Sequence, residues 1–164
     1  MVLNKSLFSS NKTDWETPDH LLKYIVERWK IDKDIAPANP NFDALAKNYR
    51  WEGRLYCNPP YGKYQIKWIR KCMEEFSQSV LLECVVFLLP ARTDTGLFKL
   101  CWDNADEIIF LQGRIRFKGA ENSAPFPSML VVFNGERIFN PEINVKIDLL
   151  SIKEIEEKYG GTNE

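Results

Sequence analysis

The residues best suited to chemistry are Asn58-Pro59-Pro60-Tyr61, which directly follow a strand-like segment, Arg54 to Cys57. The two prolines have no backbone N–H, so a sheet ladder must stop here, and each biases the residue before it toward an extended backbone. The side-chain oxygen of Asn58 and the carbonyl oxygen of Pro59 are therefore two acceptors in a stiff segment, beside the flat face of Tyr61. This combination suits the exocyclic amino group of a planar base.

The alternative interpretation of this tetrapeptide is an ordinary turn, because asparagine, proline and tyrosine are all common in loops. Its position at the carboxyl end of a strand favours ligand binding, since ligands of open α/β sheets bind beyond the carboxyl ends of the strands. We therefore treat Asn58 to Tyr61 as the candidate catalytic segment.

The elements that must position this segment alternate between helix and strand. Thr17-Pro18-Asp19 is typical of a helix start, with Thr17 as N-cap and Pro18 at the first helical position. The unbroken apolar run from Cys84 to Leu89 predicts a central strand buried on both faces. The pattern predicts helices over 18–29, 64–76, 97–102 and 152–159, and strands over 33–36, 54–57, 84–89, 107–111, 114–117 and 129–133.

This alternation predicts an α/β fold with a mostly parallel sheet and helices on both faces. The last two predicted strands, 114–117 and 129–133, are expected to form a late antiparallel pair at one side of the sheet. With 164 residues and 45% hydrophobic residues, the chain is expected to be one domain over residues 1–164. Residues 1–12 and 160–164 are expected to be flexible ends.

Composition excludes several other classes of protein. The longest apolar run is far shorter than the roughly 20 residues of a membrane helix, and residues 1–12 lack the apolar core of a signal peptide. We therefore expect a cytoplasmic protein without a membrane partner. The chain has four cysteines without a C-x-x-C spacing and one histidine, His20, so we expect no metal site and no Cys-His catalysis. The glycine-rich phosphate motifs of dinucleotide-binding and P-loop enzymes are absent.

The net charge of −1 argues against coating of nucleic acid by bulk electrostatics. The charges are unevenly distributed, however, and residues 54–118 carry an excess of three basic side chains. This stretch contains the candidate catalytic segment. It is compatible with a local, transient contact to nucleic acid, or with ordinary solvated helix faces.

Six ordered blocks resemble the phage-type DNA N6-adenine methyltransferase family, whose members use S-adenosylmethionine and an Asn-Pro-Pro-Tyr motif. The blocks extend over residues 15–134, nearly the whole chain. They are Trp15-Glu16-Thr17-Pro18, Asp34-Ile35-Ala36 with Asn41, Cys57-Asn58-Pro59-Pro60-Tyr61-Gly62, Pro90-Ala91-Arg92-Thr93-Asp94-Thr95, Gly113-Arg114-Ile115-Arg116-Phe117, and Ala124-Pro125-Phe126-Pro127-Ser128.

The resemblance implies a Rossmann-like methyltransferase core and a role for each block. Asn58 and the carbonyl of Pro59 would accept hydrogen bonds from the adenine N6 amino group, with Pro60 completing the rigid segment. Tyr61 would stack on a target base flipped out of the DNA duplex. The cofactor, S-adenosylmethionine without a metal, would contact a set of residues that extends beyond the motif: Trp15, Thr17, Pro18, Asp34, Ala36, Asn41 and Asn58.

Four basic residues are candidates for contacts with DNA phosphates. Arg92 follows the central strand, and Arg114, Arg116 and Lys118 alternate along the predicted strand 114–117 and its end. One of these arginines could pair with Asp94 or Glu107 instead. The sequence leaves the oligomeric state open.

The leading hypothesis is an adenine-N6 DNA methyltransferase of a bacterial or phage-infected cell. A second hypothesis keeps the methyl chemistry and changes the acceptor to an RNA base or a protein glutamine, since both present a planar N–H group to the motif. A third is an α/β nucleic-acid-binding module without turnover. The tetrapeptide alone does not separate the first two, and the other five blocks favour DNA.

Overall fold

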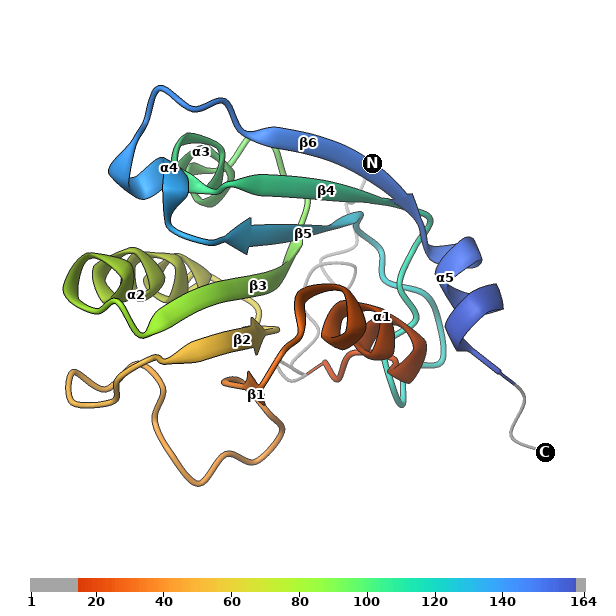
Figure 1. The fold of residues 1–164 in the computed structure, drawn as a ribbon. Coiled ribbons are helices and arrows are strands. Elements are labelled where there is room, and N and C mark those ends of the chain that lie inside the picture. Colours follow the sequence, from red (N-terminus) through yellow and green to blue (C-terminus); the bar gives the residue numbers. More distant parts are fainter. Residues whose placement is uncertain (1–14, 162–164) are drawn as a thin grey trace, which may run out of the picture.

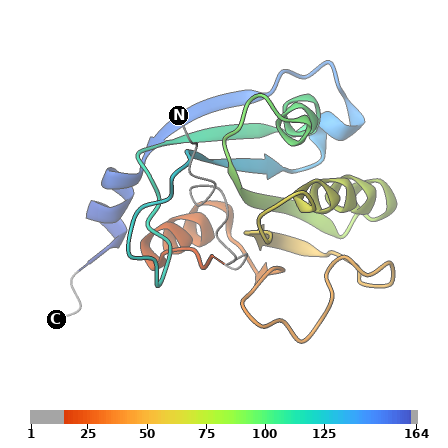
Figure 2. The same cartoon turned by 180° about the vertical axis from the view of Figure 1, so that it is seen from behind.

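A computed structural model describes residues 15–161. The expected flexible ends, 1–12 and 160–164, lie outside the described residues except for Gly160 and Gly161. The fold is a six-stranded sheet flanked by helices, seen from its two sides in Figure 1 and Figure 2. The strands lie in the order β1-β2-β3-β5-β4-β6. They are β1 (Lys33–Asp34), β2 (Gly53–Cys57), β3 (Leu82–Pro90), β4 (Glu107–Gln112), β5 (Ser128–Phe133) and β6 (Lys146–Ser151).

The strand directions confirm a mostly parallel sheet with one reversed strand. The pairs β1·β2, β2·β3 and β4·β6 are parallel, whereas β5 runs antiparallel to both of its neighbours, β3 and β4. The antiparallel direction of β5 was expected, but this strand lies inside the sheet rather than at one side.

Helices cover both faces of the sheet, as predicted. Helices α2 (Gln65–Gln78) and α3 (Gly96–Asn104) pack on one face, with the one-turn helix α4 (Glu136–Phe139) near α2. Helices α1 (Asp19–Trp29) and α5 (Ile152–Tyr159) pack together on the other face. Among the described residues, no helix has the length and apolarity needed to span a membrane.

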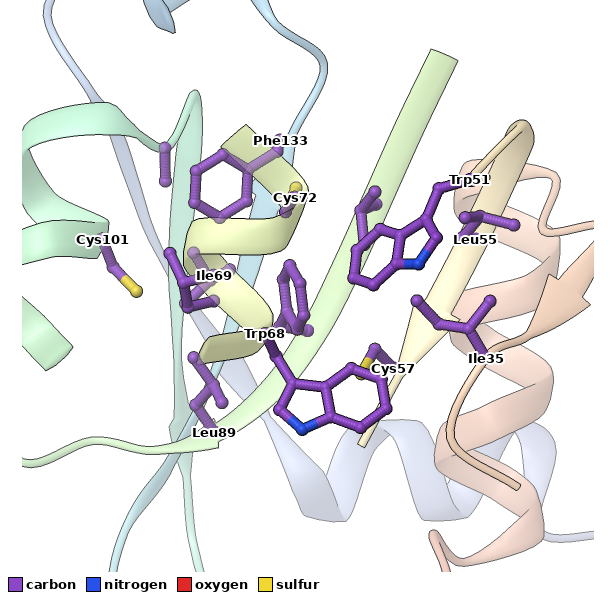
Figure 3. Close-up of a cluster of buried hydrophobic side chains, with 14 of the residues drawn as sticks. Ile35, Trp51, Leu55, Cys57, Trp68, Ile69, Cys72, Leu89, Cys101 and Phe133 are labelled. Atoms are coloured by element: carbon purple, nitrogen blue, oxygen red, sulfur yellow. The ribbon is translucent and has the colours of Figure 1, made fainter. Parts of the chain in front are cut away.

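Strand β3 divides the core into two clusters, as its unbroken apolar sequence predicts. Val85, Phe87 and Leu89 point into the cluster under α2 and α3, which Figure 3 shows with Trp51 and Trp68. Val86 and Leu88 point into the cluster under α1 and α5. Both faces of β3 are buried, and β2 pairs with this rigid strand. The end of β2 therefore holds the candidate catalytic segment in a fixed position.

The predicted strand 114–117 is wrong. Ile115 and Phe117 are buried, but this stretch has no strand pairing. Its backbone bonds to loops instead: Ala124 N–H donates to Ile115 O, and Lys118 N–H donates to Glu16 O. The apolar residues therefore anchor a loop over the α1 face, and the alternation that resembled a strand comes from this one-sided packing.

Two further differences concern elements that the sequence pattern did not predict correctly. Strand β6 and helix α4 were missed, because β6 is exposed along most of its length and α4 has only four residues. Helix α1 begins at Asp19 with Pro18 as its N-cap, and the predicted Thr17 cap is wrong. The Thr17 hydroxyl is used by Tyr56 and Asn58 instead.

Candidate active site

A pocket of about 480 Å³ lies at the carboxyl ends of β1 and β2, directly beside the Asn-Pro-Pro-Tyr segment. Its volume is within the range of small-molecule sites, roughly 300–1,000 Å³. Six parts of the chain line it: residues 15–17 before α1, Leu22 of α1, residues 34–44 from the end of β1, the end of β2 with its following loop, Trp68 of α2, and Lys118 of the loop after β4. The lining residues are Trp15, Glu16, Thr17, Leu22, Asp34, Ile35, Ala36, Pro37, Ala38, Asn39, Pro40, Phe42, Asp43, Ala44, Tyr56, Asn58, Pro60, Trp68 and Lys118.

The orientation of the Asn58 amide is fixed by two acceptors on the segment before α1. Its Nδ2 donates to the carbonyl oxygen of Trp15 at 2.5 Å and to Oγ1 of Thr17 at 3.3 Å. A carbonyl oxygen can only accept, so the amide nitrogen must face Trp15. The amide oxygen is then directed away from this anchor, and it has no hydrogen-bond partner among residues 15–161. An acceptor is thus available at the end of β2.

The Thr17 hydroxyl that accepts from Asn58 is itself paired with a second buried hydroxyl. Thr17 Oγ1 lies 2.6 Å from the Tyr56 hydroxyl, and both residues are buried. Tyr56 belongs to β2 and lies in register with Asp34 of β1. Complete burial raises the pKa of Tyr56 well above its usual value, so its hydroxyl stays protonated and serves only in hydrogen bonding. The contacts from Tyr56 through Thr17 to Asn58 therefore connect the sheet to the candidate catalytic residue.

Asp34 supplies a half-buried carboxylate at the end of β1. Its Oδ1 accepts the Ala36 N–H at 2.8 Å, which bends the chain away from the strand and turns residues 36–44 around the pocket. Burial raises the pKa of this carboxyl group, and the Ala36 N–H partly opposes the shift. A desolvated carboxylate at a pocket wall is stabilised when a donor or a cation binds to it.

The outer wall of the pocket is held by a buried ion pair on α2. Glu75 is fully buried and accepts from Lys71 Nζ at 2.5 Å and from the Trp51 N–H at 3.2 Å. Lys71 Nζ also donates to Ala46 O, and Trp51 Nε1 donates to Ala44 O. The loop between β1 and β2 is therefore attached to α2 at two backbone atoms, the Ala46 carbonyl oxygen and the Trp51 N–H, although it has little regular structure.

Tyr61 lies on the other side of the segment, among aromatic rings. Its ring meets Phe117 edge-on at 5.9 Å and Phe126 edge-on at 5.4 Å between centroids. Burial raises the pKa of Tyr61, with a smaller opposing effect from Arg92, and its buried hydroxyl has no hydrogen-bond partner among the described residues. Trp15, which lines the pocket, contacts Phe117 at 5.8 Å. These aromatic contacts link Tyr61 to the pocket wall.

The structure brings most of the predicted cofactor residues to one pocket. Trp15, Thr17, Asp34, Ala36 and Asn58 all line it. Pro18 and Asn41 do not: Pro18 is buried as the N-cap of α1, and Asn41 is exposed. The pocket also contains residues that were not among the predicted site residues: Glu16, Phe42, Asp43, Tyr56 and Trp68. Phe42 and Asp43 adjoin the predicted Asn41, so extending that block by two residues would have found them.

The predicted basic residues do not form one group, because they contact different parts of the molecule. Lys118 lines the pocket and pairs with Asp19 at 2.5 Å. Arg92 is exposed, with its guanidinium carbon 5.5 Å from the centre of the Phe126 ring, and therefore lies close to Tyr61. Arg114 and Arg116 are exposed on the loop that follows β4. The considered pairing with Glu107 is wrong, because this carboxylate pairs with Arg28 and Lys146.

Within residues 15–161, no group of three or more histidine, cysteine, aspartate or glutamate side chains is arranged to hold a metal ion. All four cysteines are buried as free thiols, and burial raises the pKa of each one. They are therefore protonated side chains of the core rather than thiolate nucleophiles.

A family model described as DNA N-6-adenine-methyltransferase (Dam) matches residues 5–151 of this chain. The chain belongs to this family. The DNA N-6-adenine-methyltransferase of Haemophilus phage HP1 (strain HP1c1) is 29% identical to it over 177 residues, which cover 96% of this chain and 98% of the phage protein. No solved structure matches the chain.

Family membership makes the chain an adenine-specific DNA methyltransferase, with DNA as its substrate and S-adenosylmethionine as the implied methyl donor. The six ordered sequence blocks predicted this family correctly. The match also extends beyond the tetrapeptide to nearly the whole fold, from before α1 to the end of β6.

Proposed function

We propose that this methyltransferase binds S-adenosylmethionine in the pocket at the ends of β1 and β2 and methylates a flipped-out adenine held between Asn58 and Tyr61. In this proposal, Asn58 Oδ1 and the carbonyl oxygen of Pro59 accept the two N–H bonds of the adenine N6 amino group. The nitrogen lone pair then leaves conjugation with the ring and points toward the pocket. Catalysis results from orientation and from stabilisation of the positive charge that develops on the nitrogen.

The observation that carries the proposal is the fixed amide of Asn58. Its nitrogen is held by the Trp15 carbonyl and the Thr17 hydroxyl, so the oxygen is presented as an acceptor before any substrate arrives. Pro59 is buried and lacks an N–H, so its position is rigid and it can only accept. Preorganised acceptors stabilise the transition state without reorganisation at the moment of reaction.

The residues of the pocket fit a cationic cofactor. Three carboxylates line it, Glu16, Asp34 and Asp43, against one lysine, Lys118, which is already paired with Asp19. Aromatic rings from Trp15 and Phe42 form part of the wall and can lie against a cation or an adenine ring. When bound, S-adenosylmethionine supplies an electrophilic methyl group on a positively charged sulfur. Asp34 is proposed to bind donor groups of the cofactor, and Asn58 to lie beside the transferred methyl group.

The aromatic cluster is the proposed site of the flipped base. Tyr61 meets Phe117 and Phe126 in T-shaped contacts, and we propose that this cluster supplies the aromatic face on which the base stacks. Base stacking on an aromatic side chain contributes about 1–3 kcal/mol. Extrusion of the adenine from the duplex costs a few kcal/mol, and this stacking offsets part of that cost.

The mechanism needs no general base at the first step. The amino group would react as a neutral nucleophile, with Asn58 Oδ1 and the Pro59 carbonyl oxygen aligning its lone pair, and the bound cofactor would supply the methyl group. The methylated nitrogen is then strongly acidic and loses a proton to solvent. His20, the one histidine of the chain, lies on α1 and is not among the residues that line the pocket.

Contacts with the DNA backbone are proposed for the exposed residues on the aromatic side. Arg92, Arg114 and Arg116 are exposed, and Arg92 lies next to the aromatic cluster. Lys118 is proposed to exchange its contact with Asp19 for a phosphate when DNA binds. The phage relative supports a role on DNA in the cytoplasm of an infected or lysogenic bacterial cell.

Labelled methyl transfer from S-adenosylmethionine to unmethylated DNA, RNA and protein, assayed in parallel, tests the proposal. We expect label in DNA alone, recovered as N6-methyladenine after hydrolysis. Label in RNA or protein without label in DNA would overturn it. Binding of the cofactor without transfer to any acceptor would instead favour a binding module.

A further inference from the structure

Strand β6 forms one edge of the sheet and is exposed along most of its length. Its hydrogen-bonded neighbour among the described residues is β4, so its other side carries open backbone groups (Figure 1). Its apolar side chains are unusually exposed for a strand, with Ile147 at 46% and Leu149 at 64%. Proteins normally protect such edges, because an open apolar strand is a template for pairing with another chain.

The apolar surface of β6 continues across the sheet onto α3. Leu149 lies in register with Phe110 of β4, so both side chains lie on the α3 face. Phe110 stacks with Phe98 at 6.3 Å, and Phe98 stacks with Trp102 at 6.0 Å. Trp102 is itself 42% exposed. A strip of apolar side chains therefore extends from the edge of the sheet to the outer face of α3, away from the methyl-transfer site.

The backbone of β6 shows which residues face outward. The Lys146 N–H donates to Asp106 O at 3.0 Å, so the polar backbone groups of Lys146 face β4. Because these groups alternate along a strand, those of Ile147 and Leu149 point to the open side. The Leu149 N–H is consistent with this pattern, because it donates to Oδ1 of the adjacent Asp148 at 2.8 Å and not to β4.

A second copy of the chain fits this edge in a register that places opposite charges across from each other. If two β6 strands pair antiparallel about a two-fold axis at Ile147, the open backbone groups of Ile147 face each other as a hydrogen-bonded pair. Lys146 then lies opposite Asp148 of the second copy, twice by symmetry, on the α5 face of the sheet. Val145 lies opposite Leu149 on the α3 face. A shift of the axis to Asp148 would instead place the two aspartates opposite each other, which is unfavourable.

We propose that this face is a self-association surface: β6 pairs antiparallel with β6 of a second copy, centred on Ile147, and joins the two sheets into one. Asp148 exchanges its contact with the Leu149 N–H, and Lys146 its 3.5 Å contact with Glu107, for the opposite charge on the second copy. The apolar strips on the two α3 helices lie on the same side of the joined sheet and flank the seam. The two methyl-transfer sites are at the opposite edges, so both stay open.

Charge reversal tests the pairing in the full chain. Wild-type protein is expected to show a concentration-dependent monomer–dimer equilibrium in sedimentation experiments. Lys146→Asp and Asp148→Lys each place like charges opposite one another twice, and each is expected to weaken the dimer about tenfold. The double variant K146D/D148K restores opposite charges and is expected to recover the wild-type dissociation constant. Lys23→Asp, an exposed change on α1, is the matched control and leaves the equilibrium unchanged.

The register is tested separately by disulfide formation. Cα atoms of a hydrogen-bonded antiparallel pair are about 5.5 Å apart, a distance that a disulfide can span. Ile147→Cys is therefore expected to give a covalent dimer under mild oxidation, and the buried native cysteines are not expected to react. Leu149→Cys is the control, because the two copies of this residue would lie about 13 Å apart along the strands.

A wild-type chain that is monomeric at every concentration would overturn the proposal. A dimer whose dissociation constant is unchanged by both charge reversals would also overturn it. The same holds for a dimer that cross-links through Leu149→Cys and not through Ile147→Cys. Thermal unfolding of each variant establishes that it is folded. None of these readouts depends on methyl transfer, so the outcome is independent of the proposed catalytic roles.

Discussion

The two ends of the Asn58–Tyr61 segment are held in contrasting ways. Asn58 is fixed by hydrogen bonds to Trp15 and Thr17, and Thr17 is supported in turn by Tyr56. Tyr61 is held by T-shaped contacts with Phe117 and Phe126, and its buried hydroxyl lacks a partner among the described residues. One end of the tetrapeptide is held by directional hydrogen bonds that leave an acceptor free, and the other is packed among aromatic rings with an unpartnered hydroxyl.

This difference matches two different tasks. An acceptor that aligns an amino group must keep its position to within a fraction of an ångström, and hydrogen bonds fix both its position and its orientation. A surface that receives a base from the duplex must rearrange, and aromatic edges with no directional bond allow it. We infer that the polar end is set before substrate binds and that the aromatic end adjusts when the base arrives.

The largest expected effect is at the polar end. Asn58→Ala removes the aligned acceptor and should lower kcat by about 100- to 1,000-fold, the usual cost of losing one preorganised group in an active site. Cofactor affinity should change only a few-fold, because the rest of the pocket is retained. Steady-state methyl transfer together with calorimetric titration of S-adenosylmethionine measures both quantities.

Asn48→Ala is the matched control, since Asn48 is an exposed residue of the loop between β1 and β2 and does not line the pocket. It should leave both kcat and cofactor affinity unchanged. Equal losses in the two variants would show that the Asn58 effect is a general consequence of altering this part of the chain.

A smaller effect is expected at the aromatic end. Tyr61→Ala removes the stacking surface and should lower kcat/KM for DNA by about 10- to 100-fold. Tyr61→Phe keeps the ring and removes a buried hydroxyl without a partner, so it should retain activity and gain about 1 kcal/mol in free energy of unfolding. If Tyr61→Phe were as inactive as Tyr61→Ala, the hydroxyl rather than the ring would be the functional group.

Thr17 tests how strongly the polar end depends on its support. Thr17→Val leaves the Tyr56 hydroxyl buried without a partner and should cost about 1–3 kcal/mol in free energy of unfolding, with a several-fold decrease in kcat. The double variant T17V/Y56F removes both hydroxyls and should recover most of the stability while kcat stays low. Recovery of kcat as well would mean that the hydroxyl pair affects Asn58 only through stability. Urea unfolding and initial rates separate these outcomes.

The smallest effect concerns Asp34 and depends on pH. Burial raises its pKa above the ordinary value of 3.8, so the folded state holds this proton more tightly than the unfolded state. Stability is therefore lost as pH rises from about 3.8 through the folded-state pKa, and the loss persists at neutral pH. Asp34→Asn keeps the acceptor for Ala36 and removes this loss, so the cofactor-free variant should be slightly more stable than wild type at neutral pH. Thermal unfolding at several pH values measures the difference, and identical pH profiles would contradict it.

The sequence predicted the order of the main elements because their apolar patterns are one-sided or unbroken. The run from Cys84 to Leu89 is buried on both faces of the sheet, and the helical spacing in 64–76 matches α2 within two residues. The pattern failed where burial depends on distant parts of the chain. Ile115 and Phe117 alternate like a strand, yet they anchor a loop over α1.

The site was predictable to the extent that its residues lie in short motifs. Asn58 follows a strand and was identified from that position, and Asp34 was identified through the family resemblance. Tyr56 carries no motif and reaches the site only through its register with Asp34. The role of Thr17 changed for a related reason. Locally it resembles a helix cap, but Tyr56 and Asn58, about 40 residues away in sequence, bind its hydroxyl.

The central claim, that the aligned Asn58 oxygen orients the adenine amino group for methyl transfer, is tested most directly by a single-turnover reaction. Wild type and Asn58→Ala, each saturated with labelled S-adenosylmethionine, are mixed with unmethylated duplex DNA, and the labelled nucleoside is identified. We predict N6-methyladenine from wild type, and a rate at least about 100-fold lower from the variant. A near-wild-type rate for Asn58→Ala, or label on a base other than adenine, would contradict the account.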